Sequence, residues 1–182
     1  KDILESWREI GRKGIKLEEQ WKETLNKKND KIKSELTNFI DSSNFKNLDE
    51  LIEKEKTKYF ELKPSMATRQ SSSAVIESVS EILPYLIGGS ADLSGSNNTK
   101  TKNSKVISAK NFDGNYIHYG VREHGMASAM NGLALYSGLI PYGGTFLIFS
   151  DYCKPSVRLS ALMGLKVIYI FSHDSIGLGE DG

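Results

Sequence analysis

The chain has 182 residues, of which 38% are hydrophobic and 26% charged, and its net charge is +1. This composition is typical of a globular domain, and the charge gives no electrostatic sign of a nucleic-acid partner or an anionic membrane surface. No apolar run reaches the roughly 18 residues of a membrane span. The single cysteine, Cys153, excludes an internal disulfide and a Cys-rich metal site, so we expect a reducing, cytoplasmic location.

The charged residues divide the chain into two parts. Residues 1–63 carry 29 of the 47 charged side chains, and residues 64–182 carry the other 18. Apolar residues of the first part recur at helical spacing: Leu17, Trp21, Leu25, Ile32, Leu36, Phe39 and Ile40. A further helix is expected over residues 47–60 with Asn47 as its cap, and no heptad persists long enough for a coiled coil. We predict a helical interdomain linker over residues 1–65.

The second part alternates between helices and apolar strands. Helices are expected over residues 67–83, 119–138 and 150–164, and strands within residues 85–93, 115–120, 139–149 and 165–182. Pro155 fits the first turn of its helix, and Gly164 fits the end of the same helix. The last strand is apolar almost throughout, which predicts that both of its faces are buried.

This alternation predicts an α/β fold over residues 66–182, with a parallel sheet and flanking helices. Ligands of such sheets gather at the carboxyl ends of the strands. The residues that stand out there are polar, charged or aromatic: Ser90, Asp92, Glu123, Phe146, His173 and Asp181. We therefore expect a ligand site along this edge of the sheet.

The triplet Arg122, Glu123 and His124 precedes an apolar helix. A glutamate in a first turn commonly does no more than complement the helix dipole. The helix that follows Glu123 is, however, nearly uncharged through residue 150. A carboxyl group held in an apolar site can give or take a proton near neutrality, which makes Glu123 a candidate general acid or base.

Two further stretches indicate ligand contacts. Phe146, Phe149 and Tyr152 are spaced by three after two glycines, a pattern usual in cores that also suits a clamp for a flat heteroaromatic ring. The loop "LIGGSADLSGSNN" offers amides and hydroxyls to a phosphate, with Arg69 as a further donor, although it is not a P-loop. The adjacent residues of "SHDSIGLGEDG" do not fit a catalytic triad. His173 and the acidic residues could ligate a metal, but their spacing has no zinc-like regularity.

As a set, "ATRQSS", "GGSADL", "YGVREHGMASAMNG", "PYGGTF" and "HDSIGLGEDG" resemble transketolase, a thiamine-diphosphate enzyme family. The resemblance is strong over about residues 66–182 and implies the pyrimidine-binding domain of the thiamine-diphosphate-binding fold. It implies that residues 1–65 connect this domain to a pyrophosphate-binding domain. We expect the chain to be a fragment, C-terminally incomplete and inactive alone.

The resemblance also implies roles for individual residues. Glu123 would hydrogen-bond the N1′ nitrogen of the cofactor's aminopyrimidine and favour its imino tautomer, with His173 as the second catalytic residue. The cofactor-binding residues would be Asp92, Leu93, Glu123, Phe146, Phe149 and Tyr152, with Phe149 stacking on the pyrimidine. The substrate-binding residues would be Arg69 and Ser96 at the sugar-phosphate end, and His173 and Asp181 at hydroxyls near the reacting carbons.

A transketolase moves a two-carbon ketol unit reversibly from a ketose phosphate to an aldose phosphate in the pentose phosphate pathway. The resemblance implies a homodimer whose sites are shared between subunits, so that this chain supplies half a site. The divalent metal, Mg or Ca, would be held by the pyrophosphate-binding domain, and no metal ligand is expected here.

Two other kinds of protein remain open. Dihydroxyacetone synthase and deoxyxylulose-phosphate synthase have a similar layout, and "GGSADL" together with "HDSIGLGEDG" favours transketolase over the latter. The alternative that is not an enzyme is a non-catalytic fragment or subunit that binds a partner protein.

Overall fold

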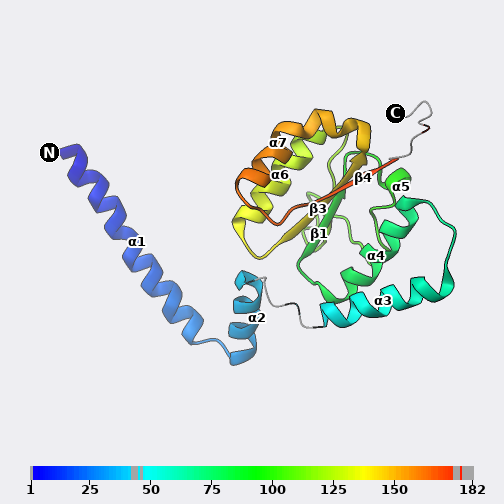
Figure 1. Ribbon diagram of the computed structural model, residues 1–182. Helices are drawn as coiled ribbons and strands as arrows, with labels where there is room; N and C mark the ends of the chain where they lie inside the picture. Colours follow the sequence, from blue (N-terminus) through cyan, green and yellow to red (C-terminus); the bar gives the residue numbers. More distant parts are fainter. Residues whose placement is uncertain (1, 42–44, 46, 174–176, 178–182) are drawn as a thin grey trace. The chain divides into compact units, whose positions relative to one another are not determined.

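The computed structural model describes residues 2–41, 45, 47–173 and 177. The chain divides into two units, Lys1–Ile40 and Asp41–Gly182 (Figure 1). Helix α1 (Asp2–Asn26) occupies most of the first unit, and α2 (Asp30–Asp41) follows it. Neither helix buries a residue. In the part of the chain that the structure describes, no helix combines the length and the apolar character needed to cross a membrane.

The second unit contains the sheet. Its elements are α3 (Leu48–Leu62), α4 (Thr68–Ile82), β1 (Leu86–Ser90), α5 (Ser94–Asn97), β2 (Tyr116–His118), α6 (Glu123–Tyr136), β3 (Ile140–Phe146), the 3-10 turn η1 (Leu147–Phe149), α7 (Ser150–Leu162) and β4 (Ile168–Ser172). The four strands are parallel and lie in the order β2-β1-β3-β4. The predicted α/β fold with a parallel sheet and flanking helices is confirmed.

Helices cover both faces of the sheet (Figure 1). On one face Tyr142 of β3 packs in a cluster with Leu83, Leu86 and Ile140, against which residues of α4 lie. The next residue, Gly143, points to the other face, because side chains alternate along a strand. A Cβ at Gly143 would come within 2.4 Å of the Met130 sulfur of α6. The glycine therefore lets α6 pack closely against the centre of the sheet.

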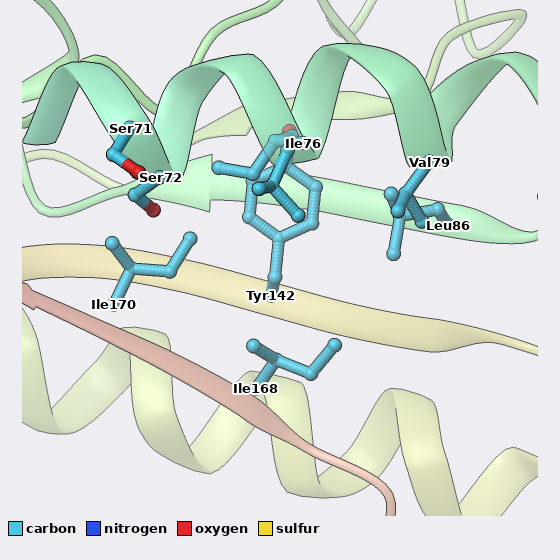
Figure 2. A pocket seen from close by; sticks show the side chains of 9 residues that line it. Ser71, Ser72, Ile76, Val79, Leu86, Tyr142, Ile168 and Ile170 are labelled. Atoms are coloured by element: carbon cyan, nitrogen blue, oxygen red, sulfur yellow. The ribbon is translucent and has the colours of Figure 1, made fainter. Parts of the chain in front are cut away.

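Strand β4 departs from its prediction. Within the described residues it pairs with β3 alone, so it is an edge strand, and Ile168 is 47% exposed. The expected burial on both faces is wrong, because an apolar sequence does not show how completely other elements cover the two faces of a strand. Ile168 and Ile170 instead line an open groove of about 320 Å³ that they share with α4. Figure 2 shows them facing Ile76 and Val79 beside the Tyr142 ring.

Two expectations about helix ends also need correction. Pro155 lies inside α7, in its second turn, because the helix begins at Ser150 directly after η1. The proline leaves the Asp151 carbonyl without an intrahelical donor. Asn47 does stand at the start of α3, but with φ 73° and no side-chain bond to the helix. The end of α7 is as predicted, since Gly164 has φ 62° and the Leu165 amide donates to the Ser160 carbonyl at 3.0 Å, as in a Schellman motif.

Candidate functional site

The carboxyl ends of the four parallel strands share one edge of the sheet. The chain runs from β1 to β2 in one direction, and from β3 to β4 in the other, so the order reverses between β1 and β3. Such a switch point is where open α/β sheets bind ligands. The candidate residues that follow a described strand are at this edge: Asp92, Leu93, Ser96, Glu123, Phe146, Phe149, Tyr152 and His173. Asp181 lies outside the described residues.

Glu123 is the first residue of α6 and is only 9% exposed. From the described part of the chain, no hydrogen bond or salt bridge reaches its carboxylate. Both neighbours in the triplet are engaged elsewhere. Arg122 Nη1 donates to the Tyr119 carbonyl at 2.9 Å, and His124 Nδ1 lies 3.2 Å from Ser156 Oγ. The nearly buried carboxylate at the mouth of this apolar helix therefore has no partner among the residues that the structure describes.

Cys153 of α7 is fully buried near this carboxylate. Burial raises the pKa of the Cys153 thiol, and the negative charge of Glu123 adds to the increase. The thiol is therefore neutral at physiological pH and behaves as a small apolar group in the neighbourhood of Glu123. Sequence reasoning missed this neighbour, because nothing in the sequence relates residue 153 to residue 123.

Phe146, Phe149 and Tyr152 form an aromatic row that runs from the end of β3 through η1 into the start of α7. The rings of Phe146 and Phe149 are stacked, with centroids 5.5 Å apart, and Tyr152 lies 5.9 Å beyond Phe149. The Phe146 ring also packs against the ring of His173, with the two centroids 3.9 Å apart. Phe146 is buried, Phe149 is half-buried and Tyr152 is 65% exposed. Phe149 and Tyr152 therefore retain ring surface that a flat ligand can contact.

Arg69 and His173 lie together although 104 residues separate them. Arg69, in the first turn of α4, places Nη1 2.9 Å from His173 Nε2, at the end of β4. Ser172 Oγ lies 3.0 Å from the other ring nitrogen, Nδ1. Sequence analysis singled out Arg69 and His173 separately, but it predicted neither their contact nor the part of Ser172.

The loop after β1 is tied down by buried polar contacts. Ser90 Oγ donates to the Gly144 carbonyl at 3.1 Å and accepts from the Leu93 amide at 3.1 Å. These contacts occupy Ser90, so it is not available to a phosphate. Asp92 adopts φ 64° and is exposed, and Ser96 is exposed on α5. These two side chains of the loop remain accessible to a ligand.

A metal centre does not emerge from the described residues, where no three His, Cys, Asp or Glu side chains gather in a suitable way. One buried polar atom does lack a partner within the described chain, the Thr145 hydroxyl of β3. It precedes Phe146, next to the switch point. An unpaired buried hydroxyl is costly unless water or a ligand satisfies it.

Known proteins resemble this chain. Residues 64–182 match the family described as transketolase, pyrimidine binding domain. The chain is 47% identical over 181 residues to a transketolase of Cereibacter sphaeroides and 48% identical to one of Sinorhizobium medicae. All of the chain is covered in both cases, but it spans only about a quarter of these relatives, 27% and 26% of their lengths.

Solved structures give the same result. A mutant transketolase of Pichia stipitis in complex with fructose 6-phosphate matches 97% of this chain and 27% of its own, with a TM-score of 0.83 and 35% identity. A transketolase of Campylobacter jejuni matches 93% of this chain and 24% of its own, with a TM-score of 0.73 and 36% identity. The chain therefore belongs to the transketolase family, and its residues 64–182 match the pyrimidine-binding domain of that family.

Proposed function

We propose that the chain supplies the pyrimidine-binding half of a thiamine-diphosphate-dependent transketolase site. The observation that carries this proposal is Glu123, a nearly buried carboxylate without a hydrogen-bond partner among the described residues, at the switch-point edge of the sheet. Glu123 is only 9% exposed and follows directly on the carboxyl-end edge of the sheet. A carboxyl group without a partner in the described chain can take up a hydrogen bond with a ligand at this edge.

The residues fit an aminopyrimidine. Glu123 would hold a proton between its carboxyl group and the N1′ nitrogen of the ring. Phe149 and Tyr152 would contact the ring face with the aromatic surface that they retain, and Phe146 supports Phe149 from behind. Asp92 and Leu93 would border the ring from the loop after β1. When bound, thiamine diphosphate supplies the carbanion-stabilising chemistry of the reaction.

Arg69, Ser96 and His173 are assigned to the sugar phosphate. A guanidinium is the side chain best suited to hold a phosphate by paired hydrogen bonds, and Arg69 lies in the first turn of α4, where the helix dipole also favours an anion. One solved relative was crystallised with fructose 6-phosphate, which supports a phosphorylated ketose as the ligand. His173 and Asp181 would meet substrate hydroxyls.

The complete protein transfers a two-carbon ketol unit between sugar phosphates of the pentose phosphate pathway in the cytoplasm. It acts as a homodimer whose site is completed across the subunit interface. A divalent ion, Mg²⁺ or Ca²⁺, is held by residues outside this chain, so that the 182 residues alone are inactive.

A reconstitution assay tests the proposal. Ketol transfer is measured with thiamine diphosphate and Mg²⁺, first with the chain alone and then with a separately made pyrophosphate-binding domain and carboxy-terminal domain of a transketolase. We expect activity only in the mixture, with pentose phosphate and not formaldehyde as acceptor. If the mixture shows no ketol transfer although its components are folded and associated, the proposed function is overturned. Preference for formaldehyde would indicate dihydroxyacetone synthase instead.

A further inference from the structure

The side chain of Asn97 ends in a buried amide at the loop after β1. Asn97 is the last residue of α5 and is 0% exposed. One of its two terminal atoms lies 2.7 Å from the Leu93 carbonyl oxygen and 3.0 Å from Thr99 Oγ1. The other terminal atom lies 3.2 Å from the backbone nitrogen of Thr145 in β3. The amide therefore contacts both the loop and the sheet.

The chemistry of these neighbours fixes how the amide is turned. A carbonyl oxygen only accepts, so the atom that faces Leu93 is the Asn97 nitrogen, and its second N–H is available to Thr99 Oγ1. A backbone N–H only donates, so the Asn97 oxygen faces Thr145 and accepts from it. Both N–H groups and the oxygen of the amide are thus satisfied, as a buried amide requires.

Helix α5 depends on this side chain. The helix is a single turn, Ser94–Asn97, in which the backbone amides of Ser96 and Asn97 donate to the Leu93 carbonyl at 3.0 and 2.9 Å. One turn is too short to be stable by itself. The Asn97 side chain donates to the same carbonyl and accepts from Thr145 of β3, so it closes the turn and attaches it to the sheet.

A second set of contacts returns from Asn97 to the start of α5. Tyr116 Oη donates to Ser94 Oγ at 2.9 Å, and Thr99 Oγ1 lies 2.8 Å from Tyr116 Oη. Tyr116 has one hydroxyl proton, so Thr99 must donate to Tyr116 and accept from Asn97. Tyr116 and Thr99 are both fully buried. Both ends of the turn are therefore held by one connected set of hydrogen bonds.

The second glycine of "PYGGTF" makes room for this amide. A Cβ at Gly144 would come within 2.7 Å of the Asn97 amide and 2.4 Å of Thr99 Cγ2. Gly144 does not adopt a positive φ, so space and not backbone conformation requires a glycine here. A side chain at this position would push the amide away from β3 without altering α5 itself.

We propose that Asn97 is a positioning residue: its amide ties α5 to β3 and thereby fixes Ser96 at the carboxyl edge of the sheet. Ser96 is exposed, and its backbone amide shares the Leu93 carbonyl with the Asn97 side chain. The attachment of α5 follows from the contacts alone. Its consequence for a sugar phosphate rests on the proposed function, which assigns Ser96 to the phosphate end of the substrate.

The first test measures the attachment of α5 in the intact chain. Asn97→Asp keeps the size of the side chain but removes both N–H donors and places an oxygen against the Leu93 carbonyl. We expect the Ser96 backbone amide to exchange its hydrogen at least about tenfold faster in this variant, with the amides of α6 unchanged, because the turn opens locally. Gly144→Ala, which adds no charge, should act in the same direction. Unchanged exchange at Ser96 in either variant would overturn the proposal.

A matched control is available on α6. Asn131 carries another buried amide, 6% exposed, whose Nδ2 donates to the Ser156 carbonyl of α7 at 2.9 Å. Asn131→Asp introduces the same charge away from α5, so it should lower the free energy of unfolding without faster exchange at Ser96. Faster exchange at Ser96 in this control as well would mean a general loss of stability and would overturn the role of Asn97.

The second test uses the complete enzyme. Asn97→Asp should raise KM for a phosphorylated ketose about tenfold more than KM for a ketol donor that lacks phosphate, the order of one lost hydrogen bond. Asn131→Asp should leave this ratio unchanged. On a Ser96→Ala background, Asn97→Asp should change the ratio no further, because a positioning residue acts only through the residue that it positions. Additive effects, or an equal rise for both donors, would overturn the proposal.

The two tests also separate this proposal from the proposed function. If Ser96→Ala by itself leaves the ratio unchanged, or the wild-type enzyme shows no ketol transfer, the role assigned to Ser96 in the proposed function is refuted. The attachment of α5 through Asn97 is still decided in that case by the exchange measurement on the intact chain.

Discussion

Helices α1 and α6 both carry apolar side chains, yet they use them in opposite ways. The 25 residues of α1 bury none, and Trp7 and Trp21 are 74% and 52% exposed. The 14 residues of α6 bury five, among them Met126 and Met130, which are fully buried. Hydrophobic periodicity therefore predicts both helices, but it does not show that only α6 packs against the sheet and so holds a candidate site residue in place.

Charges differ between the two helices in the same manner. On α1, Glu18 pairs with Lys22 one turn away, and both are largely exposed to solvent. Exposed pairs of this kind contribute little to stability. On α6, Glu123 is nearly buried and has no such partner among the described residues. In our proposal, Glu123 has no protein partner because it hydrogen-bonds the cofactor instead. Substitution of Glu123 and Glu18 tests this difference between the two carboxylates directly.

The largest expected effect comes from exchanging these two carboxylates for amides. In the complete enzyme, Glu123→Gln should lower kcat by about 100-fold or more, as expected for loss of general acid-base catalysis. Glu18→Gln, the matched change on α1, should leave kcat unchanged. Steady-state ketol transfer measures both, with circular dichroism as the control for folding. Near-normal turnover by Glu123→Gln would remove Glu123 from catalysis.

A stability measurement compares the apolar faces of the two helices. Met130→Ala removes a fully buried side chain that packs over Gly143, and it should lower the free energy of unfolding by about 2–5 kcal/mol. Ile10→Ala on α1, where the side chain is 63% exposed, should change it by less than about 0.5 kcal/mol. Urea unfolding of the intact chain gives both values. Equal losses would mean that the α1 face is as well packed as that of α6.

The same contrast explains how far prediction from sequence reached. The strand and helix pattern predicted the α/β fold, and motif order predicted the family; both are confirmed. The expected burial of β4 on both faces was wrong, because that burial depends on which elements cover the two faces, and the residues of the strand do not encode that coverage. Pro155 was misplaced because the start of α7 depends on η1, a turn that periodicity does not reveal.

The candidate site shows a similar division. The apolar helix after Glu123 signalled an unusual carboxylate, and Glu123 is only 9% exposed in the structure. The contact between Arg69 and His173 bridges 104 residues, and only the register of β3 and β4 with the position of α4 creates it. The roles of these residues toward cofactor and substrate stay predictions.

A binding measurement tests whether the aromatic row of Phe146, Phe149 and Tyr152 contacts the cofactor. Phe149→Ala should weaken thiamine diphosphate binding by the complete enzyme by about 1–3 kcal/mol, through lost stacking and apolar contact. Phe60→Ala on α3, where the ring is 76% exposed, provides the control and should leave affinity unchanged. Calorimetric titration with the cofactor measures both. Unchanged affinity in Phe149→Ala would exclude Phe149 from the pocket.

The smallest effect is the change in stability at alkaline pH. It arises from a tyrosine that packs against buried side chains of α6, whereas α1 buries no residue. Burial raises the pKa of Tyr119 to about 12 from its ordinary value of 10, and its ring packs against the cluster of Met126 and Met130. The unfolded chain loses the phenolic proton near pH 10 while the folded chain keeps it to about pH 12, so stability falls as pH rises through this window. Allowing for partial exposure of the ring, the loss should be about 1–2 kcal/mol. Tyr119→Phe should remove this share of the pH dependence of urea unfolding between pH 10 and 12, and an unchanged slope in that variant would show that the phenol is already solvated in the folded chain.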